Sequence, residues 1–495
     1  DRGKIIDRKG RVLADNITED NMKLIGREKE IRTLEEAMES KDSVFLAVYG
    51  RRRVGKTFLL RQTLSDRIVF SYSGKANITR QSQLKSFRLS LMEQGMPDCP
   101  VIKDWFTAFS CLKRLICLSS ESKKVILLDE VAWMDNHKSD FIPALEGFWN
   151  EWCSNRNDIF LIICASATSW IIDNVFHNRG GLHNRVTMRM RLSPFTLKEC
   201  EEFSIANNLS YSRKDILNLY LAIGGVAWYW TLLKKGYSVK QNISQLFFEN
   251  DSPLRGEFLE LYSSLFIRPE KYIDIILALG KKSSGLERQE LSAECKVSNN
   301  SKLGKMLQQL EECGFIRSYI PYGKKENSVV YQLIDSFSLF HLKFLSKFKG
   351  EINSDMVLSS SSYNTYCGLA FEKAVMNHLN ELKRAMGISG INTQAYTWRS
   401  NPKKLKEGEK GAQIDIVLDR ADGIINIIEA KWTSNGEPYM ISSLDEEDLL
   451  NKRRVFIEQT QTRKSVFLTM VTISGIKKNS HFDSIQNFFT LDDLF

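Results

Sequence analysis

The spacing of hydrophobic and polar residues along this chain changes period several times, and each change marks a different kind of element. Three short apolar runs with polar or glycine-rich flanks are typical of buried strands: Val44–Tyr49, Val125–Leu128 and Ile159–Ala165. Helical stretches separate them. Over residues 21–190 this alternation predicts a parallel sheet with helical crossovers, which is the pattern of an α/β fold.

Helical periodicity dominates the next part of the chain, from Thr196 to about Leu265, and predicts a helical domain over residues 191–265. Residues 266–350 change character. Three helices and then two strands are expected there, at Tyr272–Leu279, Leu286–Lys296, Asn299–Cys313, Phe315–Pro321 and Val329–Leu333. Three helices followed by a β-hairpin predict a winged helix-turn-helix.

The serine-rich residues 351–362 are interpreted as a linker. A helix is expected from Tyr366 to Leu382, and residues 412–432 read as two strands around the turn Ala421-Asp422-Gly423. A three-residue turn that ends in glycine is a favoured hairpin connection. Residues 363–495 are therefore predicted to form a separate domain with its own sheet.

Composition narrows the class of protein. The chain has 495 residues, too many for one hydrophobic core. No apolar run approaches the length of a membrane span and the start has no signal-peptide core, so we predict a cytoplasmic protein without membrane association. The nine cysteines include no C-x-x-C pair, which fits a reducing compartment and argues against a zinc site. The net charge of +9 permits an anionic partner without requiring one.

One glycine-rich segment carries the strongest chemical signal. Gly50–Thr57 reads G-R-R-R-V-G-K-T and joins the first apolar strand to a helical pattern that begins at Phe58. The two glycines, Gly50 and Gly55, allow backbone N–H groups to surround a phosphate, and the helix N-terminus adds its dipole. Lys56 would reach the β- and γ-phosphates of ATP, and the Thr57 hydroxyl would bind Mg²⁺. The alternative is a glycine-rich turn ahead of a basic helix.

Polar residues at the ends of the other two apolar strands are expected to complete this site. Asp129 would hold Mg²⁺, and Glu130 would activate the attacking water. Ser166 and Thr168 follow the third strand. A hydroxyl there would sense the γ-phosphate or, alternatively, cap a helix.

The predicted hairpin at 412–432 suggests a second chemical site. Its turn pairs Arg420 with Ile424, and the same register pairs Asp415 with Glu429 on one face of the sheet. Lys431 lies two residues further on and shares that face.

Two carboxylates and an amine on one face suit metal-dependent cleavage of phosphodiester bonds. Asp415 and Glu429 would bind Mg²⁺, and Lys431 would position water or stabilise the developing charge. Glu372, on the preceding helix, is expected to be a fourth member. The alternative is an exposed strand face that carries a salt bridge.

The predicted winged helix is more basic than the rest of the chain. Residues 266–350 contain 14 lysines and arginines against 9 acids, a net charge of +5 out of the chain's +9. This surplus favours contact with DNA. The alternative is a winged helix that serves only for packing between domains.

Residues 1–20 form an atypical leader. Arg2–Ala14 resembles the R-G-x-I-x-D-R-x-G-x-x-L-A segment of penicillin-binding proteins, but the K-T-G triad that their chemistry needs is absent. Ser120-x-x-Lys123 also fits one of their motifs, although a surface turn explains it better. Cell-wall transpeptidation therefore rests on the leader alone, which we exclude from the fold.

The nucleotide motifs resemble those of the archaeal-type ATPases of the AAA+ class, which also occur in bacteria. The shared features are the G-R-R-R-x-G-K-T loop and an I-G-R-E-x-E box at Ile25–Glu30. The resemblance implies that Gly26 and Arg27 lie near the adenine. It also implies that Asp129 and Glu130 form the second acidic motif and that Ser166 is the first sensor.

Three further segments bear on this resemblance. Leu182–Arg185 stands where the family has L-Y-G-R, which makes Arg185 the candidate arginine finger and implies a homo-oligomer. Gly224–Tyr229 matches G-G-x-P-x-Y except that Ala227 replaces the proline. The C-terminal part resembles the PD-(D/E)XK nuclease-like domain that follows a winged helix in this family, with Asp415, Glu429-x-Lys431 and Glu372 in its motif.

Two functions follow from these features. The first is an ATP-regulated, Mg²⁺-dependent nuclease that acts on DNA. The second is an ATP-driven switch that binds DNA or a protein partner and carries an inactive nuclease-like domain. A degraded domain would be expected to lack at least one of Asp415, Glu429 and Lys431, and all three are present.

Overall fold

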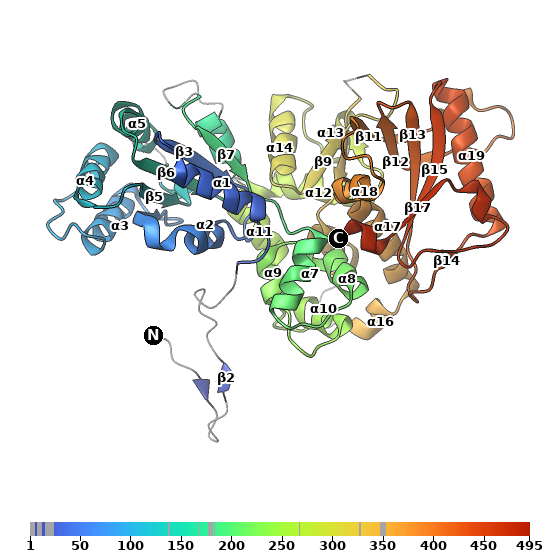
Figure 1. Ribbon diagram of the computed structural model, residues 1–495, viewed down its shortest axis with the longest axis horizontal. Coiled ribbons are helices and arrows are strands. Elements are labelled where there is room, and N and C mark those ends of the chain that lie inside the picture. The colour runs from blue at the N-terminus through green and yellow to red at the C-terminus, as the bar shows by residue number, and fades with distance from the viewer. Residues whose placement is uncertain are drawn as a thin grey trace. The chain divides into compact units, whose positions relative to one another are not determined.

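The computed structural model drawn in Figure 1 describes residues 24–136, 139–166, 168–176, 182, 184–266, 268–325, 328–346 and 353–495, with the backbone of 5–6 and 12–14. Its contacts divide the chain into two units. The first contains residues 1–50 and 55–192. The second contains residues 193–495 together with the short segment Arg51–Val54. The division at residue 192 lies close to the predicted end of the first domain at 190.

The first unit is built on a parallel sheet, as the sequence predicts; the sheet has five strands, three of which the apolar runs mark. Its strands are β3 (Val44–Tyr49), β4 (Ile68–Ser73), β5 (Lys124–Asp129), β6 (Ile159–Ala165) and β7 (Met188–Arg191). They lie side by side in the order β4-β5-β6-β3-β7. Strand β6 therefore separates β3 from β5, and the ends of all three meet at one edge of the sheet.

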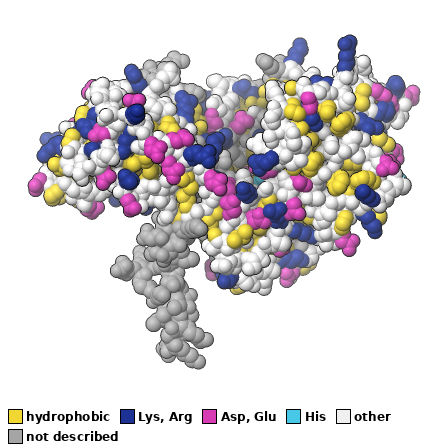
Figure 2. Space-filling model, in the orientation of Figure 1, with side chains coloured by type: hydrophobic (Ala, Val, Ile, Leu, Met, Phe, Trp, Pro, Cys, Tyr) yellow, Lys and Arg dark blue, Asp and Glu magenta, His cyan; other side chains and the backbone are white. Residues whose placement is uncertain are grey.

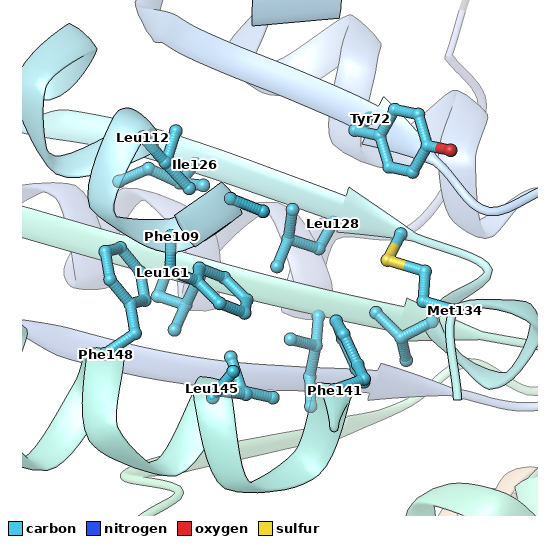
Figure 3. Packing of buried hydrophobic residues seen from close by; sticks show 14 of the residues in the cluster. Tyr72, Phe109, Leu112, Ile126, Leu128, Met134, Phe141, Leu145, Phe148 and Leu161 are labelled. Carbon is cyan, nitrogen blue, oxygen red and sulfur yellow. The ribbon is translucent and has the colours of Figure 1, made fainter. Parts of the chain in front are cut away.

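Helices cover this sheet and exclude water from it. They are α1 (Glu28–Glu39), α2 (Lys56–Leu64), α3 (Arg80–Glu93), α4 (Trp105–Leu118), α5 (Phe141–Gly147) and α6 (Thr168–Ile171). Figure 3 shows Phe109 and Leu112 of α4 and Phe141 of α5 packed over Leu128 of β5 and Leu161 of β6, all buried. Side chains on both faces of β3 are buried, which explains why the sequence of this strand is a continuous apolar run.

The second unit begins with a group of helices where the sequence predicts a helical domain. They are α7 (Leu197–Ala206), α8 (Arg213–Ile223), α9 (Ala227–Thr231), α10 (Val239–Phe247) and α11 (Glu257–Leu265). Ala227 is the first residue of α9, so the turn at Gly224-Gly225 forms without the proline of the related motif. A Cβ on Gly225 would lie 1.9 Å from the Phe195 carbonyl oxygen, and only glycine fits there.

The three helices and two strands predicted for residues 272–333 are present. They are α12 (Pro269–Lys281), α13 (Arg288–Glu294), α14 (Ser301–Glu312), β9 (Ile316–Tyr319) and β10 (Val330–Leu333). The prediction of a helix from Leu286 is wrong by two residues. Leu286 and Glu287 form a short strand, β8, because they pair with β10 and complete a sheet in the order β8-β10-β9.

The linker predicted at 351–362 is also wrong where the structure describes it. Helix α15 (Ser336–Phe344) is followed by α16 (Ser354–Leu358) and α17 (Ser361–Asn377). Ser360 caps α17 by accepting a hydrogen bond from the Tyr363 N–H at 3.1 Å. A serine run thus supplies a helix start rather than a flexible segment. The helix predicted at 366–382 is interrupted at His378, after which α18 (Leu379–Ala385) begins.

A mixed sheet forms the rest of the second unit. Its strands are β11 (Thr393–Arg399), β12 (Gln413–Arg420), β13 (Ile424–Lys431), β15 (Ser465–Thr472) and β17 (Asn487–Thr490), in that order across the sheet. The first two pairings are antiparallel and the last two are parallel. Helix α19 (Ser443–Thr460) buries Leu449, Val455 and Phe456 in the same core as Ile414 and Leu468.

The predictions for the N-terminal leader lie almost wholly outside the described residues. Only the backbone of Ile5–Ile6 and Val12–Ala14 is described, as an antiparallel pair, β1 and β2. Among the described residues, no helix combines the length and apolar character that a bilayer crossing requires.

Candidate nucleotide site and a second carboxylate site

The loop from Gly50 to Thr57 joins β3 to α2 and takes up backbone conformations that favour glycine. Gly50 and Gly55 have φ values of 142° and 93°. A Cβ on Gly50 would lie 2.3 Å from the Leu192 carbonyl oxygen, so no other residue fits. Between them Arg53 also has a positive φ, 70°, which costs an L-residue with a Cβ about 1–2 kcal/mol.

Lys56 is held at the start of α2 with its ammonium pointing back towards the loop. The side chain is 5% exposed, and its Nζ donates hydrogen bonds to the Gly50 carbonyl at 2.9 Å and to Ser166 Oγ at 3.1 Å. A buried ammonium beside glycine-rich backbone at a helix N-terminus is an arrangement that attracts phosphate oxygens.

Thr57 and Asp129 form a second contact in the same place. The Thr57 hydroxyl donates to Asp129 Oδ2 at 2.7 Å, and Asp129 Oδ1 accepts from the Glu130 N–H at 2.8 Å. A hydroxyl and a carboxylate oxygen are the hard donors that Mg²⁺ prefers alongside phosphate and water. The residues present therefore fit this ion.

Ser166 connects the lysine to the second acid. Its hydroxyl accepts from Lys56 and donates to Glu130 Oε1 at 2.6 Å. This contact follows from the sheet order, because β6 ends between β3 and β5. The side chain of Thr168, the other hydroxyl considered, lies outside the described residues.

Glu130 carries local strain. Its φ is 48°, in the left-handed region, and it precedes a short 3₁₀ turn at Val131–Trp133. Non-glycine residues held in this region cluster at active sites, where the surrounding structure fixes them. The conformation directs the Glu130 carboxylate towards Ser166 and away from the strand it follows.

The other predicted residues of this site are Gly26, Arg27 and Arg185. Gly26 and Arg27 both have positive φ values, 62° and 63°, immediately before α1, and the Arg27 side chain is buried. Arg185, the candidate arginine finger, is exposed in a turn where its N–H donates to the Leu182 carbonyl at 3.1 Å.

Comparison with known proteins bears on this site. Residues 24–233 match the family described as "ATPase domain predominantly from Archaea". The chain is 24% identical over 428 residues to protein MJECL04 of Methanocaldococcus jannaschii, covering 82% of this chain and 87% of that one.

Solved structures to which the chain is similar include the Walker-type ATPase paby2304 of Pyrococcus abyssi. It is 17% identical with a TM-score of 0.49, and the match covers 67% of this chain and 99% of that one. The ORC2 protein of Aeropyrum pernix is 13% identical with a TM-score of 0.43, over 65% of this chain and 93% of that one.

The hairpin that carries the second site has the predicted register. Ile416 pairs with Ile428 and Val417 with Ile427, and the next step of this ladder places Asp415 opposite Glu429. The turn glycine, Gly423, has the expected positive φ of 86°. The prediction of the register is therefore confirmed.

Glu372 of α17 lies close enough to these strands to feel their charges. Burial, and then the carboxylates of Asp415 and Glu429, raise the pKa of Glu372 to about 8. Two cations lie on the other side of the group. Burial lowers the pKa of Arg317 to about 10, and burial together with Arg317 lowers the pKa of Lys373 to about 8. The Glu372 carboxyl thus feels two other carboxylates, and burial disfavours the charged forms of Glu372, Arg317 and Lys373.

Lysines already occupy both oxygens of Glu429. Lys431 Nζ lies 3.1 Å from Oε1, and Lys452 Nζ, from α19, lies 2.8 Å from Oε2. Asp415 Oδ1 accepts from Gln413 Nε2 at 2.9 Å. Within the described part of the chain, no three Asp, Glu, His or Cys side chains form a group arranged to hold a metal. Carboxylate oxygens still fit Mg²⁺ in kind, but an ammonium has to leave Glu429 before a cation can bind it.

Sequence reasoning missed Lys452, Lys373 and Arg317. Lys452 follows Glu429 by 23 residues and no motif marks it. Its ion pair with Asp448 at 3.1 Å, four residues earlier on the same helix, is the local signal.

The structure also explains the Ser120-x-x-Lys123 motif. Lys123 is buried rather than on a surface turn, because its Nζ donates to the carbonyls of Ser40, Asp42 and Asn157.

Proposed function

We propose that this protein binds ATP with Mg²⁺ and hydrolyses it. The observation that carries the proposal is the contact chain from Lys56 through Ser166 to Glu130, beside the Thr57–Asp129 pair. When bound, Mg²⁺ would draw charge from the phosphates. Lys56 would hold the β- and γ-phosphates, Ser166 would place its hydroxyl near the γ-phosphate, and Glu130 would accept a proton from water.

Binding of ATP is tested at Lys56. We expect Lys56→Ala to abolish saturable binding of Mg-ATP, because it removes the buried charge that faces the loop. Isothermal titration calorimetry on the full chain measures this directly. Lys123→Ala provides a control for the loss of a buried lysine elsewhere in the same unit. Equal ATP affinity of wild type and Lys56→Ala would contradict the nucleotide site.

We further propose that residues 266–350 form a winged helix that contacts DNA through α14. This helix buries Leu303, Leu307 and Leu310, while Lys302 and Lys305 are exposed. The tip of the hairpin supports a different role. The Tyr322 N–H donates to the Thr397 carbonyl of β11 at 2.8 Å, and the ring packs on Phe456. The tip is therefore occupied by an internal contact, although Lys324 and Lys325 remain exposed.

Charge reversal separates these two surfaces. Lys302→Glu with Lys305→Glu should weaken binding to duplex DNA and reduce the slope of log K against log salt by about 2, because two phosphate contacts are lost. Lys324→Glu with Lys325→Glu makes the same change in net charge at the tip and should have the smaller effect. Fluorescence anisotropy at several salt concentrations measures both. Unchanged affinity in both variants would leave this domain as packing only.

For the C-terminal domain we propose a PD-(D/E)XK nuclease-like role, namely Mg²⁺-dependent cleavage of DNA. The residues of this site would be Asp415, Glu429, Lys431 and Glu372. The support is the register of the hairpin and the raised pKa of Glu372, which burial and the carboxylates of Asp415 and Glu429 cause. The second candidate is an ATP-driven switch with an inactive domain. The two lysines on Glu429 favour it, since they neutralise a carboxylate that the nuclease needs for its metal.

On the visible face of the molecule, Lys and Arg side chains are interspersed with Asp and Glu rather than gathered by sign (Figure 2). The described residues of this face form no broad basic surface, so the proposed contact with DNA depends on single elements such as α14. The exposed position of Arg185 is consistent with a role in trans in a homo-oligomer, which remains a prediction.

A further inference from the structure

The centre of the phosphate loop has contacts of its own that the loop motif does not explain. Arg51–Val54 belong by their contacts to the second unit, whereas Gly50 and the residues from Gly55 belong to the first. Two side chains of this segment, Arg51 and Arg53, make ion pairs with carboxylates of the second unit. We refer to these two pairs, Arg51–Asp335 and Arg53–Glu257, as the loop anchor.

Arg51 is enclosed almost completely. Its side chain is 2% exposed and that of Asp335 is 4% exposed, and its guanidinium lies 4.8 Å from the centre of the Phe315 ring. Burial lowers the pKa of Arg51, but Asp335 more than offsets this and keeps the group charged. Asp335 also caps α15, since its Oδ2 accepts from the Ser338 N–H at 2.9 Å and from the Ser338 hydroxyl at 2.6 Å. One carboxylate therefore joins the loop to the first turn of α15.

Arg53 is fixed through both its side chain and its backbone. The guanidinium pairs with Glu257, which is 2% exposed, and lies 3.9 Å from the centre of the Trp228 ring. The Arg53 carbonyl accepts from the Trp228 N–H at 3.2 Å, and Glu257 accepts from the Tyr229 hydroxyl at 3.2 Å. These contacts surround the one non-glycine residue of the loop with a positive φ, 70°. An unfavourable conformation of this kind persists only when its surroundings impose it.

We propose that Arg51 and Arg53 are positioning residues for ATP: their buried ion pairs with Asp335 and Glu257 hold the centre of the loop in the conformation that receives the phosphates. The inference rests on the proposed binding of ATP and extends it. It makes the first turn of α15 and the start of α11 part of the machinery that sets nucleotide affinity. Because coupling is reciprocal, bound ATP stabilises these same elements.

Two variants test the anchor in the full chain. Arg53→Gly removes the ion pair and the ring contact but suits a positive φ better than arginine does. Asp335→Asn keeps an acceptor for the Ser338 N–H while it removes the charge opposite Arg51. We expect each to raise the Kd for Mg-ATP about tenfold or more in calorimetry. Arg213→Ala is the control, because it removes an arginine that pairs with Glu201 at 2.8 Å elsewhere in the second unit, and its Kd should stay within twofold of wild type.

Hydrogen exchange on the wild-type protein supplies a readout that needs no variant. The Ser338 and Leu339 amides, which bond to Asp335, should exchange at least about tenfold more slowly with saturating Mg-ATP. The Tyr363 amide, held by a similar serine cap on α17, should not change.

The outcomes distinguish this inference from the proposed function. If wild type binds no Mg-ATP, the proposed function fails and the anchor with it. If wild type binds Mg-ATP but folded Arg53→Gly and Asp335→Asn bind it within twofold, the anchor alone is overturned. If neither variant folds, the exchange experiment decides, and unchanged rates at Ser338 and Leu339 overturn the anchor.

Discussion

Replacing Glu130 with glutamine should stop ATP turnover while leaving ATP bound. The amide has the same shape and still accepts the hydrogen bond that Ser166 donates at 2.6 Å, so the contact chain to Lys56 survives. The amide cannot accept a proton from water. Loss of a general base costs roughly 10²- to 10⁴-fold in rate, and we expect kcat to fall by that amount with the Kd for ATP within threefold of wild type.

Phosphate release and calorimetry, run on the same preparations, separate the two effects. Glu121→Gln is the control. It makes the same chemical change shortly before the first residue of β5, whereas Glu130 follows the last one, and it should hydrolyse ATP as wild type does. Hydrolysis at the wild-type rate by Glu130→Gln would move the catalytic carboxylate elsewhere. Loss of binding together with turnover would instead assign Glu130 a role in holding the loop.

The second large effect is expected at Asp415. In the proposed nuclease site, a divalent cation bound between Asp415 and Glu429 should raise the melting temperature of the protein by mass action. Asp415→Asn should remove most of the shift produced by Mn²⁺, since it deletes one charged ligand. Cleavage of plasmid DNA should fall with it. Lys431→Ala should keep or enlarge the shift, because it removes one of the two ammonium groups on Glu429. It should lose roughly 10²- to 10³-fold in cleavage, because the lysine acts on the developing charge.

Asp419→Asn is a matched control for this experiment. Asp419 lies on the same strand, β12, and its carboxylate is paired with Lys464 at 2.6 Å rather than with the proposed site. It should leave the Mn²⁺ shift unchanged. A wild-type protein that shows no shift with millimolar Mn²⁺ or Mg²⁺, and leaves DNA intact with or without ATP, would contradict the nuclease role and favour the switch.

Local signals in the sequence were enough for the most apolar strands of the first unit and for the hairpin. Continuous apolar runs predicted β3 and β6 to the residue, because strands buried on both faces have no polar positions. The Ala421-Asp422-Gly423 turn determined the register of β12 and β13, since a three-residue turn with a left-handed glycine permits only one pairing.

Local sequence patterns could not predict features that depend on distant parts of the chain. The order of strands in the first unit places Ser166 between Lys56 and Glu130, and no local pattern encodes that order. The same limit applies to the ion pair between Arg51 and Asp335, which lie 284 residues apart. The serines at 351–362 failed as a linker signal because a residue that suits loops also suits helix caps.

The internal contact of the hairpin tip has a consequence for how the second unit folds. Tyr322 completes the core beside Phe456, and the Tyr366 hydroxyl donates to the Leu221 carbonyl at 2.6 Å. His378 Nε2 accepts from the Leu197 N–H at 3.0 Å. The helices α7–α11, the β9–β10 hairpin and the segment from Ser361 onwards are therefore joined by these contacts. A chain that began at residue 363 would lack these partners, so we expect residues 193–495 to melt in a single cooperative transition.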